Sequence, residues 1–176
     1  FGVEVATLEE AHVLCLFDQL PAALEMGRQV FARLPNVKNV PEKFGDQVVV
    51  NENDEVETLV EKYLGGATDI PFAELGGLAQ ALGGLFIPAH IDKPVFSVTS
   101  QLGFLPPGAY PAIEATRFNR AAVERDWGAL YPVISNSDAH DLDSVGVCFN
   151  EFEADEWSLA SFRAALSARR VCVRTR

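Results

Sequence analysis

Two short apolar runs that end in polar, histidine-containing segments constrain the fold of this chain more than any other feature. Residues 85–87 (Leu-Phe-Ile) lead into His90, and residues 131–134 (Tyr-Pro-Val-Ile) lead into a segment with Asp138 and His140. Apolar runs of this length are typical of buried strands. Helices that alternate with buried strands predict an α/β barrel or a doubly wound sheet. In such barrels the functional site is built where strands end and loops begin.

The apolar spacing predicts further elements around these strands. We expect strands at residues 2–7, 12–17, 112–115, 147–152 and 171–173, helices at 21–34, 54–64, 71–82 and 158–167, and a mobile loop at 35–53. Ser158 is the expected cap of the last helix. If the first hairpin turn centres on Leu8, Glu4 and His12 face each other, and a carboxylate and an imidazole can share a ligand.

Composition limits the class of protein. The chain has 176 residues and a hydrophobic content of 48%, which suits one domain over residues 1–176. Its formal charge of -11 disfavours nucleic acid as a partner unless metal or a local basic patch offsets that charge. No apolar stretch approaches the roughly 20 residues of a membrane span, so no membrane partner is expected. Three cysteines without metal-site spacing favour a reducing, cytoplasmic location and are interpreted as small core residues.

Each of the three histidines lies in a setting that suits a metal ion, and each also has a structural explanation. Asp138 and His140 are two residues apart, so in an extended segment both side chains project to one side and can hold one ion. Alternatively, Asp138 caps a turn and His140 is a hydrogen-bonded loop residue. His90 and His12 can equally be structural histidines that bond to the backbone. Carboxylate and imidazole ligands together suit zinc, manganese or iron.

Four segments follow one another along the chain: residues 2–5 (Gly-Val-Glu-Val) with His12, residues 84–94, residues 97–106 and residues 136–140. Within them, Ile-Pro-Ala-His at 87–90 and Ser-Asp-Ala-His at 137–140 are the most specific. Together these segments resemble the polymerase and histidinol phosphatase (PHP) family. The resemblance implies a distorted (β/α)7 barrel with two or three metal ions at one end. Members open with a His-x-His strand, which this sequence lacks, so the resemblance also implies a barrel that is incomplete at its N-terminal end and about half of the ligand set.

The resemblance implies roles for five side chains. By matched position Glu4 is a bridging carboxylate, and His12, His90, Asp138 and His140 are further metal ligands. Asp138 and His140 are also the implied catalytic residues. The implied cofactors are divalent ions of manganese, zinc or iron, two or three in a complete site and one or none in this chain.

Two cations are candidates for binding a substrate phosphate. Lys93 closely follows His90, and Arg117 follows the strand predicted at residues 112–115. Lysine binds phosphate as a point charge, without the bidentate fork of arginine. The alternative is that both are ordinary surface cations.

The function implied by the resemblance is that of a metal-dependent phosphoesterase. Such an enzyme would hydrolyse a small phosphomonoester or a short nucleotide with metal-activated water. Two alternatives stay open: a non-catalytic metal-binding or structural module, and a nuclease acting on DNA, against which the charge of -11 counts. An open barrel edge also predicts self-association of the chain.

Overall fold

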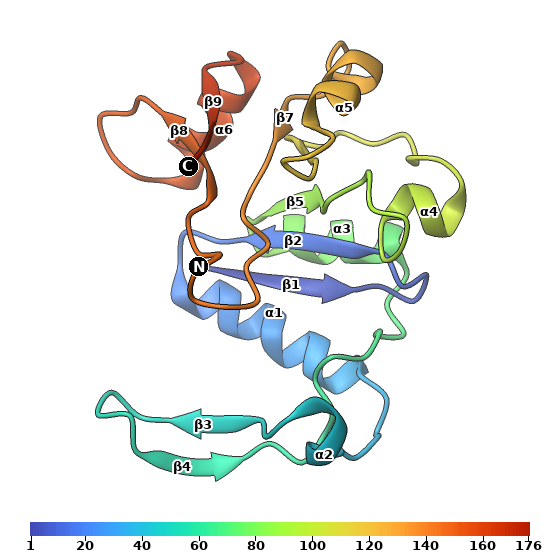
Figure 1. Ribbon diagram of the computed structural model, residues 1–176, viewed down its shortest axis with the longest axis vertical. Coiled ribbons are helices and arrows are strands. Elements are labelled where there is room, and N and C mark those ends of the chain that lie inside the picture. The colour runs from blue at the N-terminus through green and yellow to red at the C-terminus, as the bar shows by residue number, and fades with distance from the viewer.

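The sheet that carries the candidate site starts with an antiparallel hairpin. The computed structural model describes residues 1–176. Strands β1 (Gly2–Ala6) and β2 (His12–Leu16) pair antiparallel, and β5 (Leu85–Pro88) adds to the other edge of β2. Val13 and Cys15 of β2 are buried in the core. Helices α1 (Leu20–Arg33) and α3 (Phe72–Ala81) lie beside this sheet (Figure 1).

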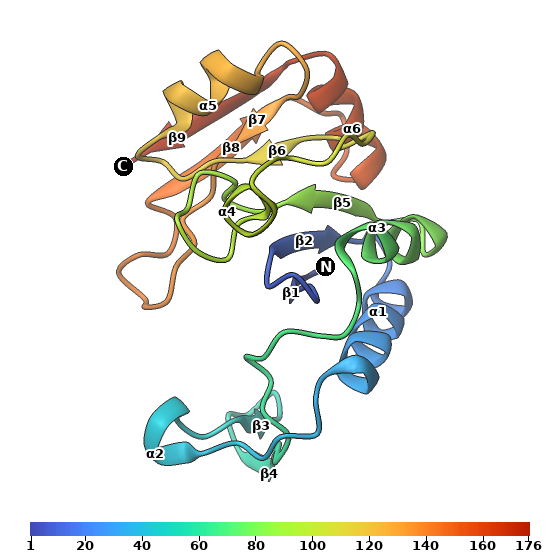
Figure 2. The ribbon, with the colours of Figure 1, turned by 90° about the vertical axis from the view of Figure 1, so that its right-hand side faces the viewer.

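The C-terminal half adds two small sheets and three helices. Strands β6 (Ile113–Glu114) and β7 (Val133–Ile134) pair parallel, and β8 (Cys148–Phe152) and β9 (Val171–Thr175) pair antiparallel. The helices are α4 (Val98–Leu102), α5 (Arg120–Trp127) and α6 (Leu159–Ser167). Figure 2 shows these pairs beyond β5, on the side away from β1.

The strands do not form a closed barrel. They make one three-stranded sheet and three two-stranded sheets, and β1 pairs on one edge only. The predicted distorted (β/α)7 barrel is therefore not confirmed, whereas the mixed α/β class is. Strands β6 and β7 are only two residues long, which is too short to form the long continuous ladders that barrel closure requires.

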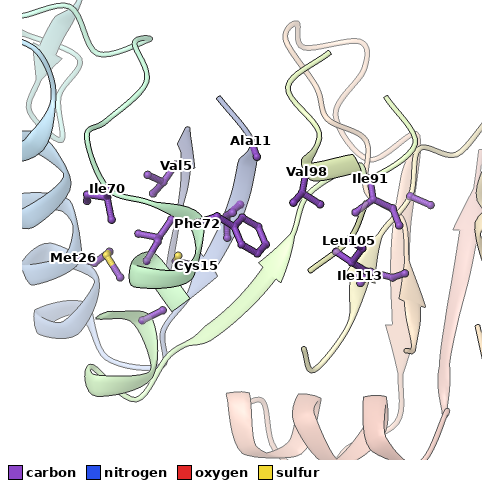
Figure 3. Packing of buried hydrophobic residues seen from close by; sticks show 14 of the residues in the cluster. Val5, Ala11, Cys15, Met26, Ile70, Phe72, Ile91, Val98, Leu105 and Ile113 are labelled. Atoms are coloured by element: carbon purple, nitrogen blue, oxygen red, sulfur yellow. The ribbon is translucent and has the colours of Figure 1, made fainter. Parts of the chain in front are cut away.

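The interior consists of two hydrophobic clusters. The larger cluster of 16 buried residues joins the hairpin, α1 and α3 to the loops that follow β5, and Figure 3 shows Val5, Phe72, Val98 and Ile113 within it. The smaller cluster of seven buried residues packs α6 against β5 and β7. Burial of this kind stabilises by about 25 cal/mol per Å² of apolar surface. The packing fixes the strand ends where the candidate ligands lie.

Residues 35–64 differ from the sequence-based expectation. The predicted helix at 54–64 is wrong, because strand β4 (Val56–Leu59) pairs antiparallel with β3 (Val48–Val50). The turn explains the difference. Asn51 Oδ1 accepts hydrogen bonds from the backbone N of Asn53 and Glu55, and Asp54 adopts a φ of 61°. The expected mobile loop at 35–53 contains β3 and the short helix α2 (Pro41–Phe44).

Most other predicted elements are confirmed within one or two residues. Ser158 caps α6 as expected, since its Oγ accepts from the backbone N of Ser161 at 3.0 Å. Helices α4 and α5 were not predicted. Cys15 and Cys148 are buried, but Cys172 is exposed on the last strand, so its interpretation as a core residue is wrong. None of the helices combines the length and the apolar character that crossing a bilayer requires.

Candidate metal centre and cleft

Glu4 and His12 meet through a register that differs from the predicted one. The ladder sets Ala6 opposite His12 and Glu4 opposite Leu14, so the expected direct pairing of Glu4 with His12 is wrong by two residues. A shift of two residues keeps each side chain on its own face of the sheet. Glu4 and His12 are therefore diagonal neighbours, and His12 Nδ1 lies 3.2 Å from Glu4 Oε1.

His90 joins these two residues from the end of β5. Its side chain is only 3% exposed, and its Nε2 lies 3.5 Å from Glu4 Oε1. One ligand atom each of Glu4, His12 and His90 lies within 4.8 Å of the others, and we call these residues the ligand cluster. The hydrogen bond of His12, and then that of His90, hold the pKa of Glu4 well below its usual range, so this carboxylate is ionised.

The ligand cluster fits a divalent transition-metal ion. His90 Nδ1 is buried and has no hydrogen-bond partner, which is unusual because buried polar atoms are nearly always paired. One carboxylate with two imidazoles is a donor set that zinc, manganese and iron accept. The ring of Phe96 stacks on His12 with centroids 5.2 Å apart, so one ligand is also packed in place.

Glu114 is a buried residue beside the ligand cluster that the sequence analysis missed. It lies on β6 and is 5% exposed, and burial raises the pKa of its carboxyl group. Its Oε2 accepts from the backbone N of His90 at 3.0 Å, and its Oε1 accepts from Asn136 Nδ2 at 2.6 Å. His90 has a φ of 28°, which is strained for a non-glycine residue. Glu114 therefore ties the strained His90 backbone to the segment after β7. One acidic residue inside the apolar run 112–115 was the available signal.

Asp138 and His140 lie near the ligand cluster but outside it. The Asp138 carboxylate is paired with Lys93 Nζ, and His140 is 83% exposed. His140 Nδ1 lies 2.9 Å from the backbone oxygen of Asp138. The structure thus brings Glu4, His12 and His90 together, whereas Asp138 and His140 lie on the loop between β7 and β8. Their roles as ligands and catalytic residues stay predictions.

Two adjoining cavities connect these groups. A cleft of about 300 Å³ is lined by His90, Lys93, Arg117, Asp138 and His140, among others. A neighbouring hollow of about 470 Å³ has Glu4 on its wall. Asp138, Asn136 and Glu114 line both cavities. Lys93 and Arg117 therefore face the space beside the ligand cluster, although their binding of phosphate stays a prediction.

Comparison with known proteins agrees with this architecture. Residues 118–171 match a family model described as PHP-associated. A solved lesion-specific endonuclease, PfuEndoQ from Pyrococcus furiosus, shares the fold with a TM-score of 0.63 and 20% identity over 95% of this chain and 38% of that chain. Endonuclease Q in complex with a 27-mer duplex substrate with an abasic lesion at the active site matches with a TM-score of 0.62, 20% identity and the same shares, 95% and 38%. No curated protein matches the chain.

The family model confirms the PHP family resemblance over residues 118–171, which include the segment 137–140. The chain spans about 38% of the length of both solved proteins, and at this identity they establish the fold.

The prediction that nucleic acid is a disfavoured partner is wrong. A solved protein with this fold holds a 27-mer duplex substrate. The charge of -11 is a sum over the whole chain, and residues 37–64 carry seven acidic side chains against three basic ones. The cleft places the cations Lys93 and Arg117 beside the carboxyl groups of Glu114, Asp138 and Asp141. Because fields act locally, net charge does not describe the potential at one cleft.

Proposed function

We propose, on the premise that the chain resembles the PHP family, that it carries a metal-dependent nuclease site that hydrolyses phosphodiester bonds in damaged DNA. The observation that carries the proposal is the ligand cluster of Glu4, His12 and His90, whose ligand atoms lie within 4.8 Å of one another. The fold likeness to a lesion-specific endonuclease supports DNA as the substrate class.

The ligand cluster would hold the ion, and Asp138 lies with Glu4 on the wall of the adjoining hollow. A bound divalent ion would lower the pKa of water and stabilise the charge that develops on a phosphate. Glu4 contributes an ionised carboxylate, because hydrogen bonds to His12 and His90 lower its pKa. Glu114 positions His90 through the backbone hydrogen bond of 3.0 Å.

The cations of the cleft suit a phosphodiester backbone. Lys93 and Arg117 both line it, and opposite charges there offset the charge of a bound phosphate. Lys93 is paired with Asp138 in the structure. A phosphate that takes Lys93 as its partner releases the Asp138 carboxylate on the wall of the cleft. Asp138 and His140 are the proposed catalytic residues because both line this space.

A cleavage assay with matched duplexes tests this proposal. The chain is incubated with a duplex that contains one abasic site, and with the same duplex undamaged, in the presence of Mn²⁺, Zn²⁺ or Fe²⁺. We expect strand cleavage at the lesion that is abolished by a chelator and by Glu4→Gln. The control variant Asp155→Asn lies in the acidic segment 151–156, outside the residues that line the cleft, and should cleave like wild type. Absence of cleavage with all three metals, or equal cleavage by Glu4→Gln, would contradict the proposal.

The same assay separates the earlier alternatives. The phosphomonoesterase hypothesis predicts hydrolysis of a generic aryl phosphate with an intact duplex product, and the structural-module hypothesis predicts turnover of neither substrate. The fold likeness favours the duplex.

A further inference from the structure

One segment of the chain stands apart from the body of the molecule. Residues 37–64, which we call the arm, contain α2, β3 and β4. Figures 1 and 2 show the β3–β4 hairpin beyond α1, away from the three-stranded sheet. The two strands pair with each other and with no other strand. At the base of the arm, Lys62 Nζ donates to the backbone oxygen of Phe31 in α1 at 2.7 Å. The backbone N of Asn39 donates to the backbone oxygen of Glu61 at 2.7 Å, which joins the two ends of the arm.

One face of this hairpin is apolar and uncovered. The ladder sets Val48 opposite Leu59, and Val50 opposite Val56 across a β-bulge. Directly paired residues and residues two apart on a strand share a face, so these four side chains form one strip. They are 44–66% exposed. A two-stranded hairpin is marginally stable in water unless its apolar face packs on another element. No element of the body provides that packing.

The rim of the strip is acidic. The arm has seven acidic and three basic residues. Glu52, Asp54, Glu55 and Glu57 are all exposed around the turn and along β4. This charge repels DNA phosphates, and it repels the arm of a second copy of the chain equally. The surface is therefore complementary to a partner with an apolar centre and a basic border.

We propose that the arm is a docking surface for a basic amphipathic helix of a partner protein. The strip is two strands wide, and neighbouring strands lie about 4.8 Å apart. The apolar stripe on one side of a helix about 10 Å in diameter has a similar width. A third strand added at the edge would leave the apolar face open, whereas a helix laid across the face covers it. Lysine or arginine residues that flank the apolar stripe of the helix pair with the acidic rim.

A synthetic probe tests this docking surface directly. The probe is a fluorescent helical peptide with leucine at positions i, i+3, i+4 and i+7 and lysine at the flanking positions, titrated with the whole chain by fluorescence anisotropy. Saturable binding is expected, with an affinity that falls as salt is added. Val50→Ser/Val56→Ser should weaken binding at least tenfold, because it removes one cross-strand apolar pair. The matched control, Leu24→Ser/Leu130→Ser, removes exposed leucines outside the arm and should bind like wild type.

Hydrogen exchange on the wild-type chain gives a second readout that does not depend on how a variant folds. The peptide should slow amide exchange across residues 48–59 and leave β1, β2 and β5 unchanged. The proposal is overturned by absence of binding, by equal binding to the double-serine variant, or by protection outside the arm. It is also overturned if a peptide with glutamate in place of lysine binds equally, if duplex DNA displaces the peptide from the arm, or if sedimentation shows that the arm dimerises the chain.

Discussion

The two halves of the candidate site are built in different ways. Glu4 and His12 lie on strands, and His90, which is 3% exposed, lies two residues after β5. Their chain neighbours Val5, Ala11, Val13 and Ile91 belong to the larger core cluster. Asp138 and His140 lie on the loop between β7 and β8, where His140 is 83% exposed. Packing against the core holds side chains at strand ends, whereas the position of a loop side chain depends on the groups that it binds. The fold alone assembles the ligand cluster, and we expect that metal or substrate completes the loop half.

The largest expected effect comes from removing the central carboxylate of the ligand cluster. Glu4→Gln removes the anionic ligand that both His12 and His90 approach. Loss of a residue that only supports a ligand lowers metal affinity roughly 10- to 100-fold, so loss of a direct ligand should exceed about 100-fold. Calorimetric titration with Zn²⁺ measures this change. Glu153→Gln is the matched control and should bind Zn²⁺ like wild type. An unchanged Zn²⁺ affinity in Glu4→Gln would contradict the difference between the strand half and the loop half of the candidate site.

The next largest effect is expected for Glu114, the residue that links the two halves of the candidate site. Glu114→Ala leaves the backbone N of His90 and the amide of Asn136 without their acceptor. Because an unsatisfied buried group costs about 1–3 kcal/mol, we expect the free energy of unfolding to fall by about 2–4 kcal/mol. Urea denaturation measures it. Glu114→Gln keeps one acceptor oxygen and should lose less. Equal stability of all three proteins would show that Glu114 does not join the halves.

A smaller effect is expected in the loop half. Asp138→Ala removes the partner of Lys93 and a carboxylate from the cleft wall. We expect cleavage of the abasic duplex to fall about 100-fold, the lower end of the range for a lost general acid or base, while Zn²⁺ affinity at the ligand cluster stays within about twofold of wild type. Steady-state cleavage and metal titration on the same samples test this pair of outcomes. A joint loss of metal and activity would place Asp138 inside the ligand cluster.

The smallest effect is a difference in pH dependence between two carboxylates. The pKa of Glu4 is lowered by His12 and His90, so its stabilising contribution is present above the unfolded pKa of about 4.3 and is lost as the pH falls below it. Burial raises the pKa of Glu114, so its ionisation destabilises the fold as the pH rises above about 4.3. In metal-free urea titrations between about pH 2 and pH 7, Glu4→Gln should flatten the rise in stability with pH below about pH 4.3, and Glu114→Gln should steepen the pH dependence above it. Parallel curves for both variants and wild type would contradict these assignments.

The sequence predicted the elements around the site better than their assembly. Alternating and buried apolar runs predicted β1, β2 and β5 because those patterns follow directly from which faces are covered. The register was wrong by two residues, since periodicity fixes the face of a strand and the turn fixes the pairing. The hairpin of the arm was missed because Val56 and Leu59 also fit helical spacing.

The candidate site was predicted only in part. The residues of the ligand cluster were identified through the family resemblance, since a lone histidine after a strand has a structural explanation as well. Glu114 acts through a hydrogen bond to a backbone 24 residues away, and no local pattern encodes that contact. Partner chemistry was misjudged because a whole-chain charge of -11 does not say where single cations such as Lys93 and Arg117 lie.

The most direct test of the central claim is a Zn²⁺ titration of wild type and His90→Ala under identical conditions. His90 is the buried member of the ligand cluster, and its Nε2 lies 3.5 Å from Glu4 Oε1. We predict one saturable high-affinity site in wild type, absent from His90→Ala, with both proteins folded by circular dichroism. Equal binding by the two proteins, or no saturable site in wild type, would contradict the assignment of Glu4, His12 and His90 as a metal centre.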